Sequence, residues 1–442
     1  MVNQSTLARG CGGFGLGCPF IPADNLTTLR CCAREVQNRT NMPKIADTLI
    51  VLFTRGMSLR EWSLSGMLSR ELALYRRLAE RYGRIVFVTY GDTAERSYLI
   101  GCVTEAEASK MIVCGNDQRM PIDAYEASLL ARLRTLLGTD RTVVMKSNQM
   151  SCYAGTPALA DALAENGRRV ALIARGGYLW SRLAAHTRGP DSPEAIDAAE
   201  REASLCRSAS LVVGTTEAMV KDLCWRYTLK PEAARVIPNY VDLAEPPRGA
   251  ESRDRNLVLY AGQLAPVKRV DLLIEAMAVI KGSMGDGPVL EIIGAGPERK
   301  RLEDLAAAIE APVRFVDRMP HEALIRRMGE CAVYVQASET EGHPKTVIEA
   351  MATGAPVVVA DSPGLGDVVS HGSTGLRVAG EPRAFAHAIE SLLGDADWRE
   401  LLGSAASTGA RAQYGLDRIL TLEIEAHQTA IARAAVTERA AA

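Results

Sequence analysis

The chain alternates short, nearly continuous apolar runs with longer amphipathic or charged segments. In the first half these runs cover residues 48–54, 84–90, 110–115, 142–148, 169–176, 210–216 and 235–240. Such runs, rich in β-branched residues, are typical of parallel strands that are covered on both faces. The segments between them, for example residues 66–83, are long enough for crossover helices. This half therefore predicts a doubly wound α/β domain.

The alternation restarts after residues 242–256, a charged segment with two prolines that is typical of a linker between domains. The later runs cover residues 257–262, 289–294, 313–319, 331–338, 355–361 and 375–380. We therefore expect an α/β fold with two doubly wound Rossmann-like domains, residues 45–241 and 257–415, that face a cleft. Ligands of such sheets bind beyond the carboxyl ends of the strands, so the cleft is the expected site.

The two ends of the chain lack this alternation. Residues 1–44 have no strand pattern, and GCGGFG at 10–15 satisfies G-x-G-x-x-G without a strand before it or a clear helix after it. We expect residues 1–44 to form a flexible N-terminal extension. Residues 416–435 have the pattern of one helix, so we expect residues 416–442 to form a C-terminal helix that crosses the domain junction or packs back on the first domain.

Composition excludes several classes of function. The formal net charge of -2 gives no reason to expect nucleic-acid binding, and no apolar run approaches the length of a membrane span. Four of the ten cysteines fall in the first 32 residues without a common zinc spacing, and the scattered remainder are typical of reduced, buried thiols. We expect a cytoplasmic protein with at most peripheral membrane contact.

The stretch SETEGHPKTVIEAMATGAPVVVAD at 338–361 places Glu341 and Glu349 around the start of an expected helix. A strand ends near Ser338, and a helix begins near Lys345. The free N–H groups of a helix N-terminus bind phosphate well. Two plainer interpretations stay open: Glu349 could complete a capping box with Thr346, and Glu341 could be a solvated loop charge.

Two glycine turns in the second half have the same strand–turn–helix design. In VLYAGQLAPVKRVDLLIEAM (258–277), Lys268 falls in the turn or in the first helical turn. A cation there fits a diphosphate better than it fits the helix dipole, which would prefer an acid. Gly294-Ala295-Gly296-Pro297 follows the next strand, and its plainer interpretation is a turn before a helix that Pro297 leads.

Residues 256–402 resemble the nucleotide-sugar domain of glycosyltransferase family 4, the retaining enzymes of GT-B fold. The resemblance rests on YAGQLAPVKRVDLLIEA, IIGAGPERKRLEDLA, the 338–361 stretch and GLGDVVSHGSTGLRV, in that order. In the first half, RVIPNYVDL is similar to the family's Pro-Asn-x-Val-Asp joint. The resemblance implies transfer of a sugar from a nucleotide-diphosphate sugar to an acceptor, with retention of configuration. It implies no metal and no cofactor, because the nucleotide sugar is a co-substrate.

The resemblance also implies roles for particular residues. Glu349 would accept hydrogen bonds from ribose hydroxyls, and Glu341 would lie by the transferred sugar. The implied catalytic residues are Glu341 and Lys268. The implied donor-binding residues are Gly262, Gln263, Lys268, Gly294, Met319, His343, Pro344, Lys345, Thr346, Val347 and Glu349. Gln263 stands where the family usually carries an arginine. Either Arg269 or Arg175 compensates for the missing charge, or activity is weak, or the phosphate is bound in a different way.

The first domain should bind the acceptor, which could be a sugar, a glycan, a lipid-linked sugar or a small molecule. Arg60 and Trp62 follow the first strand, and Arg175 and Tyr178 end another. These four residues are the acceptor candidates. Core packing is the plainer interpretation of an aromatic residue such as Trp180, and the basic helix at 70–84 is expected to present a solvated face.

Other interpretations remain open at this point. Asp395-Ala396-Asp397 imitates a metal-binding pattern, but its position before WRELLGSA favours helix capping, so no metal site is expected. Two alternatives to the transferase are a non-catalytic protein that binds sugar nucleotides and another reaction on the same fold, such as epimerisation.

Overall fold

The computed structural model describes residues 43–441, except residues 166, 244 and 286. The expectations for the N-terminal extension, its glycine-rich motif and its four cysteines lie outside the described residues. Among the described cysteines, Cys114, Cys152, Cys206 and Cys331 are buried free thiols, while Cys102 and Cys224 are partly exposed.

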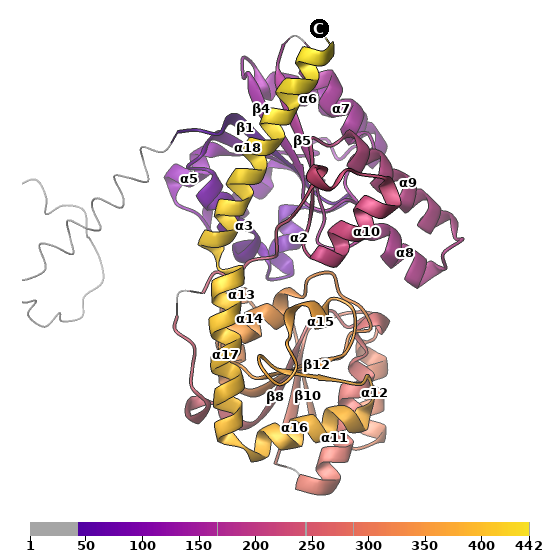
Figure 1. The fold of residues 1–442 in the computed structure, drawn as a ribbon, viewed down its shortest axis with the longest axis vertical. Helices are drawn as coiled ribbons and strands as arrows, with labels where there is room; N and C mark the ends of the chain where they lie inside the picture. Colours follow the sequence, from indigo (N-terminus) through magenta and orange to yellow (C-terminus); the bar gives the residue numbers. More distant parts are fainter. Residues whose placement is uncertain (1–42, 166, 244, 286, 442) are drawn as a thin grey trace, which may run out of the picture. The chain divides into compact units, whose positions relative to one another are not determined.

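The first domain contains a parallel sheet of seven strands in the order β3-β2-β1-β4-β5-β6-β7 (Figure 1). The strands are β1 (Ala46–Leu52), β2 (Tyr82–Val88), β3 (Met111–Cys114), β4 (Thr142–Ser147), β5 (Arg169–Arg175), β6 (Leu211–Gly214) and β7 (Ala234–Val236). Each of them overlaps an apolar run of the sequence. Strands β1 and β2 begin two residues before those runs, because their pairing already starts at Ala46 and Tyr82.

Helices cover both faces of this sheet with separate apolar cores. On one face, Leu72 of α3 (Leu68–Leu78) packs in the same core as Trp62 of α2 (Leu59–Leu64). On the other face, Leu133 and Leu223 belong to a core built from α6 (Ile122–Leu137), α7 (Thr156–Ala164), α9 (Pro193–Ser208) and α10 (Glu217–Tyr227). The remaining helices of this domain are α4 (Arg96–Ile100), α5 (Glu105–Lys110) and α8 (Trp180–Arg188).

The second domain has a parallel sheet of six strands in the order β10-β9-β8-β11-β12-β13. The strands are β8 (Asp254–Ala261), β9 (Val289–Ile293), β10 (Val313–Val316), β11 (Cys331–Gln336), β12 (Val357–Ala360) and β13 (Leu376–Val378). Strand β8 therefore takes in residues 254–256, which composition assigned to the linker. The preceding Arg253 is 7% exposed and donates hydrogen bonds to the carbonyls of Met328, Cys331 and Thr353. This buried arginine anchors the entry to β8.

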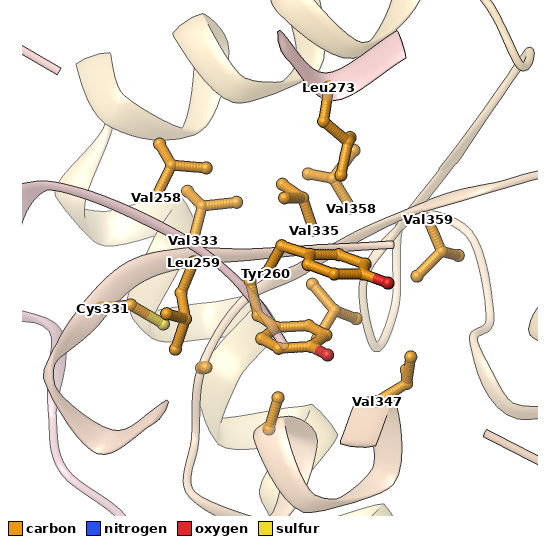
Figure 2. Close-up of a cluster of buried hydrophobic side chains, with 14 of the residues drawn as sticks. Val258, Leu259, Tyr260, Leu273, Cys331, Val333, Val335, Val347, Val358 and Val359 are labelled. Atoms are coloured by element: carbon orange, nitrogen blue, oxygen red, sulfur yellow. The ribbon is translucent and has the colours of Figure 1, made fainter. Parts of the chain in front are cut away.

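The core of the second domain positions the first turn of helix α14 (Lys345–Ala352). Val258, Val333 and Val358 from β8, β11 and β12 are fully buried beside Leu273 of α11 (Val270–Met284) (Figure 2). Val347 of α14 belongs to the same core, so burial of its side chain fixes the turn that precedes the helix. The other helices are α12 (Arg299–Ala308), α13 (His321–Glu330), α15 (Leu365–Val368), α16 (Pro382–Gly394) and α17 (Ala396–Tyr414).

The C-terminal helix α18 (Leu416–Ala441) returns to the first domain, as the sequence predicts. Helix α17 packs against α14 of the second domain, whereas α18 contacts α3, β4, β5 and β6 of the first domain. Val241 and Gly415 form a parallel bridge at the crossing point. Along the part of the chain that the structure describes, no helix combines the length and apolar character needed to span a membrane.

Candidate functional site

The turn between β11 and α14 has the strand–turn–helix geometry that the sequence predicts. Strand β11 ends at Gln336, and α14 begins at Lys345 after Pro344. No side chain caps this helix, so the interpretation of Glu349 as part of a capping box with Thr346 is wrong. Val347 N and Ile348 N donate to the Pro344 carbonyl at 3.1 and 3.2 Å, so the capacity to bind an anion rests on the amides that precede them.

Glu341 is held from three sides by the second domain. Its Oε1 accepts hydrogen bonds from Lys268 Nζ at 2.6 Å, Ser338 Oγ at 2.7 Å and Gln336 Nε2 at 3.2 Å. Lys268 ends the short 3-10 turn Pro266–Lys268 between β8 and α11. The Glu341 side chain is only 13% exposed, so the interpretation as a solvated loop charge is wrong. The two residues that the resemblance marks as catalytic thus form a direct ion pair.

Glu349 is buried, with 1% of its side chain exposed. Its Oε1 lies 3.0 Å from His321 Nε2 and 3.4 Å from Arg70 Nη1, while Oε2 has no hydrogen-bond partner among the described residues. Burial alone would raise the pKa of Glu349, but the nearby Arg70, His321 and Lys345 lower it below its usual value. The carboxylate is therefore ionised and keeps one oxygen for a further donor.

The glycine turns that follow β8 and β9 lie in close contact with each other. Gly294 has a φ of +153°, and a Cβ at this position would lie 1.9 Å from the Gly262 carbonyl oxygen. Only glycine allows this close approach of the two turns. Helix α12 begins at Arg299 rather than at Pro297, because Glu298 N donates to Leu264 O at 3.1 Å and the chain is still turning there.

Two other predicted donor-binding residues, Gln263 and Met319, are at least partly exposed. Gln263 is exposed. Met319 is partly buried, and a Cβ on Gly66 of the first domain would lie 2.5 Å from its carbonyl oxygen. The predicted donor-binding residues therefore extend to the contact with the first domain.

The His343 turn contacts the first domain directly. A Cβ on Gly342 would lie 2.0 Å from the Gly177 carbonyl oxygen, and Asn239 Nδ2 donates to His343 O at 2.8 Å. The His343 ring is 7% exposed and meets Tyr414 edge to face. Burial, with the positive charges of Arg175 and Lys345, lowers the pKa of His343 to about 3. The ring is therefore neutral near pH 7, and its Nδ1 has no partner in the described part of the chain.

The remaining residues of this turn differ in exposure. Pro344 and Val347 are buried, and Thr346 is half-buried. Because the Val347 side chain is in the core, only its backbone can face a ligand. The prediction that these three residues contact a donor thus concerns main-chain groups more than side chains.

One of the four acceptor candidates lies in the apolar core of the first domain, and the other three do not. Trp62 is 3% exposed and stacks on Phe53 with ring centroids 4.2 Å apart, so the structure corrects it from an acceptor candidate to a core residue. Arg60 is exposed on α2. Tyr178 lies beside the turn at Gly342, because a Cβ on Gly342 would be 3.0 Å from the Tyr178 Cβ. Arg175 ends β5 and reaches Asn239 Oδ1 at 3.4 Å.

Helix α3 contributes two residues that sequence reasoning missed. Arg70 contacts Glu349, and Glu71 pairs with Lys345. Burial alone would raise the pKa of Glu71, but Lys345 and Arg70 lower it to about 2. The expectation of a solvated face is wrong for this first turn of the helix, where the two side chains are 12% and 14% exposed. In the sequence, the only local sign of these contacts is that two opposite charges are adjacent, and this pattern does not identify the partners of either charge.

Asp395-Ala396-Asp397 is the sequence motif that imitates a metal site. Asp395 is the N-cap of α17 and accepts from Trp398 N at 2.8 Å, as expected for a capping residue. Among the described residues, no group of three or more histidine, cysteine, aspartate or glutamate side chains is arranged to hold a metal ion. Metal independence itself stays a prediction.

Comparisons with known proteins agree with this architecture. Residues 244–408 match the family model "Glycosyl transferases group 1". The D-inositol 3-phosphate glycosyltransferase of Jonesia denitrificans is 30% identical over 254 residues, which are 52% of this chain and 59% of that protein. The enzyme of the same name from Corynebacterium glutamicum is 30% identical over 243 residues, or 50% and 58% of the two chains. The chain thus matches less than two thirds of the length of these curated relatives.

Solved structures show the fold. Sucrose-phosphate synthase (tll1590) from Thermosynechococcus elongatus superposes with a TM-score of 0.68 and 19% identity, over 87% of this chain and 99% of that one. Anabaena Alr3699/HepE in complex with UDP and glucose superposes with a TM-score of 0.64 and 18% identity, over 86% and 98%. The chain has the GT-B fold of two Rossmann-like domains, and its second domain matches the group 1 glycosyl transferases.

Proposed function

We propose that the protein is a retaining glycosyltransferase that uses a nucleotide-diphosphate sugar and needs no metal ion. The observation that carries this proposal is the arrangement of Glu341, Lys268 and Glu349 around the uncapped start of α14. The match of residues 244–408 to the glycosyl transferases group 1 model supports it.

The nucleotide would bind to the second domain through two kinds of contact. Glu349 Oε2 has no partner in the portion of the chain that the structure describes, which suits a ribose hydroxyl as donor. The amides after Gly342 and the first turn of α14 suit the phosphates, because the helix N-terminus carries a partial positive charge. This proposal explains why Glu349 is present in a helix that binds phosphate, because the ligand of Glu349 would be the ribose of the nucleotide.

The reaction needs charge stabilisation more than a covalent intermediate. In the mechanism that the resemblance implies, the bond from the anomeric carbon to the phosphate oxygen breaks while the acceptor oxygen forms a bond on the same face. The acceptor proton passes to an oxygen of the departing diphosphate. Lys268 and the helix amides would stabilise the negative charge that develops there, and Glu341 would lie by the cationic sugar. No protein nucleophile is assigned.

The acceptor is proposed to be a hydroxyl-bearing sugar, glycan, lipid-linked sugar or small molecule bound by the first domain. Of the acceptor candidates, Tyr178 lies next to the 342–347 turn. Because the solved relative from Anabaena is described with UDP and glucose, uridine donors are the first to test.

The test is a transfer assay in the presence of EDTA. Purified protein is incubated with UDP-, GDP- and ADP-sugars and a panel of acceptors, and nucleoside diphosphate release and the anomeric configuration of the product are followed by NMR. We expect transfer with retention, lost in Glu349→Gln and kept in Glu425→Gln, which removes an exposed carboxylate of α18. Binding without turnover would favour the non-catalytic alternative, and conversion of the donor sugar without transfer would favour epimerisation.

A further inference from the structure

Arg175 is a buried cation whose ion pair with Glu423 is long. Its side chain is 11% exposed, its Nε lies 3.6 Å from Glu423 Oε1 and its Nη2 lies 3.4 Å from Asn239 Oδ1. The Nε atom has no hydrogen-bond partner among the described residues. Buried polar groups in folded proteins are nearly always paired, so this guanidinium is short of a partner.

The nearest carboxylate, Glu423, is shared between two cations, and its Oε1, which lies nearest Arg175, forms no hydrogen bond within the described part of the chain. Glu423 Oε2 accepts from Lys146 Nζ at 2.6 Å and lies 3.3 Å from His427 Nε2, and all three side chains are at most 1% exposed. Burial outweighs the attraction of Glu423 and lowers the pKa of Lys146 to about 8, below its usual value. One carboxylate therefore faces two cations, Lys146 and Arg175.

The other cations at the domain contact have shorter ion pairs than Arg175, and Arg70 lies near two carboxylates, Glu349 and Glu71. Arg70 meets Glu349, and Lys345 meets Glu71. Arg175 is thus the surplus positive charge of this group. An uncompensated buried charge is costly, and an anionic ligand would remove that cost.

Arg175 also lies at the turn where the donor phosphates are expected. Asn239, which accepts from Arg175, donates to the His343 carbonyl at 2.8 Å. Gly177, two residues after Arg175, makes the close contact with Gly342. The surplus charge is therefore on the first-domain side of the 342–347 turn.

Two cations of the second domain near this turn each have an ion pair that offsets part of their charge. Lys268 binds Glu341 at 2.6 Å, and Arg269 binds Glu339 at 3.0 Å. Gln263 brings no charge. We propose that Arg175, from the first domain, binds the diphosphate of the donor and stabilises the charge on the departing nucleoside diphosphate. This inference rests on the proposed function and adds a catalytic residue to it.

The experiment compares nucleotides that differ only in phosphate. Calorimetry with EDTA measures binding of UDP and uridine, or of the GDP or ADP series if the wild type prefers that base, to the full chain and to Arg175→Gln. We expect UDP affinity to fall by about tenfold or more, because a charge-assisted contact is lost, while uridine affinity stays the same. Arg182→Gln is the matched control, because Arg182 forms an exposed pair with Asp222 in the same domain, and it should bind UDP like the wild type.

The outcomes separate this inference from the proposed function. If Arg175→Gln binds UDP as the wild type does while Glu349→Gln binds it weakly, the role of Arg175 is overturned and the nucleotide site stands. Equal losses for UDP and uridine also overturn it, because they indicate a structural role. Failure of the wild type to bind any nucleoside diphosphate overturns the proposed function itself.

If Arg175→Gln does not fold, a second variant tests the same inference. Arg175→Lys keeps the charge beside Glu423 but loses the planar fork of donors, so UDP affinity should fall by about threefold or more with uridine binding unchanged. No loss for UDP, or the same loss for both ligands, overturns the inference in that variant too.

Discussion

Arg70 Nη1 lies 3.4 Å from Oε1 of Glu349, so a cation of the first domain contacts the carboxylate proposed to bind ribose in the second. The next residue, Glu71, pairs with Lys345. Two adjacent charges of α3 thus meet two opposite charges of α14. Because the same side chains serve the domain contact and the proposed nucleotide site, ligand binding and domain contact must affect each other.

The first prediction concerns the pair between Glu71 and Lys345. Lys345→Glu places two carboxylates together in a nearly buried position, so the free energy of unfolding should fall by about 3–5 kcal/mol. The double variant Glu71→Lys with Lys345→Glu should recover part of that loss, because it restores the ion pair in the reverse direction but places a lysine beside Arg70. Urea unfolding of the three proteins measures this.

The control for this swap is Lys300→Glu. Lys300 pairs with Asp304 on an exposed helix face, where the two side chains are 81% and 63% exposed, so reversal of its charge should change stability little. If the double variant were as unstable as Lys345→Glu, the direct pairing of the two residues would be contradicted.

The second prediction tests what Glu349 binds. Glu349→Gln should weaken binding of a ribonucleoside diphosphate by about 1.5–3 kcal/mol, because a charge-assisted hydrogen bond is lost. The 2′,3′-dideoxy analogue lacks the donors, so its affinity should change little in the same variant. Calorimetry on both ligands separates a ribose contact from a general effect on folding, since Glu349 also holds Arg70. Equal losses for the two analogues would assign Glu349 to the domain contact alone.

The third prediction concerns Gln263, which is exposed in the turn after β8. If Arg175 already binds the diphosphate, Gln263→Arg should improve UDP affinity only slightly in the wild type. In the Arg175→Gln background, the new cation should recover a large part of the lost affinity. A gain of the same size in both backgrounds would mean that the two positions act independently.

Much of the fold follows from the sequence because parallel strands are buried on both faces. Val333 and Val335 lie in such a strand, and a continuous apolar run is the direct consequence. The strand limits are less accurate, because backbone pairing continues beyond the apolar residues, as at Ala46 and Tyr82.

The candidate site is predicted only in part. Lys268 and Glu341 are each close to a turn with a recognisable pattern, and the structure brings them together. Arg70 is 279 residues from Glu349, so nothing local in the sequence indicates their contact. Glu349 itself fits a capping box in sequence, but Pro344 is the N-cap of the helix and the Glu349 carboxylate contacts Arg70 of the first domain.

The fourth prediction follows from the position of Trp62. An aromatic residue after a strand can face a ligand or the core, and the stacking on Phe53 places Trp62 in the core. Trp62→Ala should lower the free energy of unfolding by about 3–5 kcal/mol, whereas Trp62→Phe should cost much less. Neither the acceptor KM nor the nucleotide affinity of Trp62→Phe should change. A raised acceptor KM with unchanged stability would return Trp62 to the acceptor site.

The last prediction is a pH dependence of stability that depends on His343. Its pKa is about 3 in the folded protein because the ring is buried near Arg175 and Lys345, whereas an unfolded histidine has a pKa of about 6.5. Between these values the unfolded chain binds more protons, so folding stability is fully present above pH 6.5 and is lost as the pH falls. One such group contributes about 1.4 kcal/mol per pH unit, or about 2 kcal/mol between pH 6.5 and pH 5.

His343→Phe keeps an aromatic ring against Tyr414 and removes the titrating group. Urea unfolding at pH 7 and pH 5 should show that the variant loses about 2 kcal/mol less than the wild type. His427 also has a lowered pKa from burial, but it is present in both proteins and cancels in the comparison. Glu71, with a pKa of about 2, remains ionised in the folded state throughout this window. An identical pH dependence in the two proteins would show that the folded protein accommodates a charged imidazole at position 343. The conclusion that the His343 ring is neutral would then be wrong.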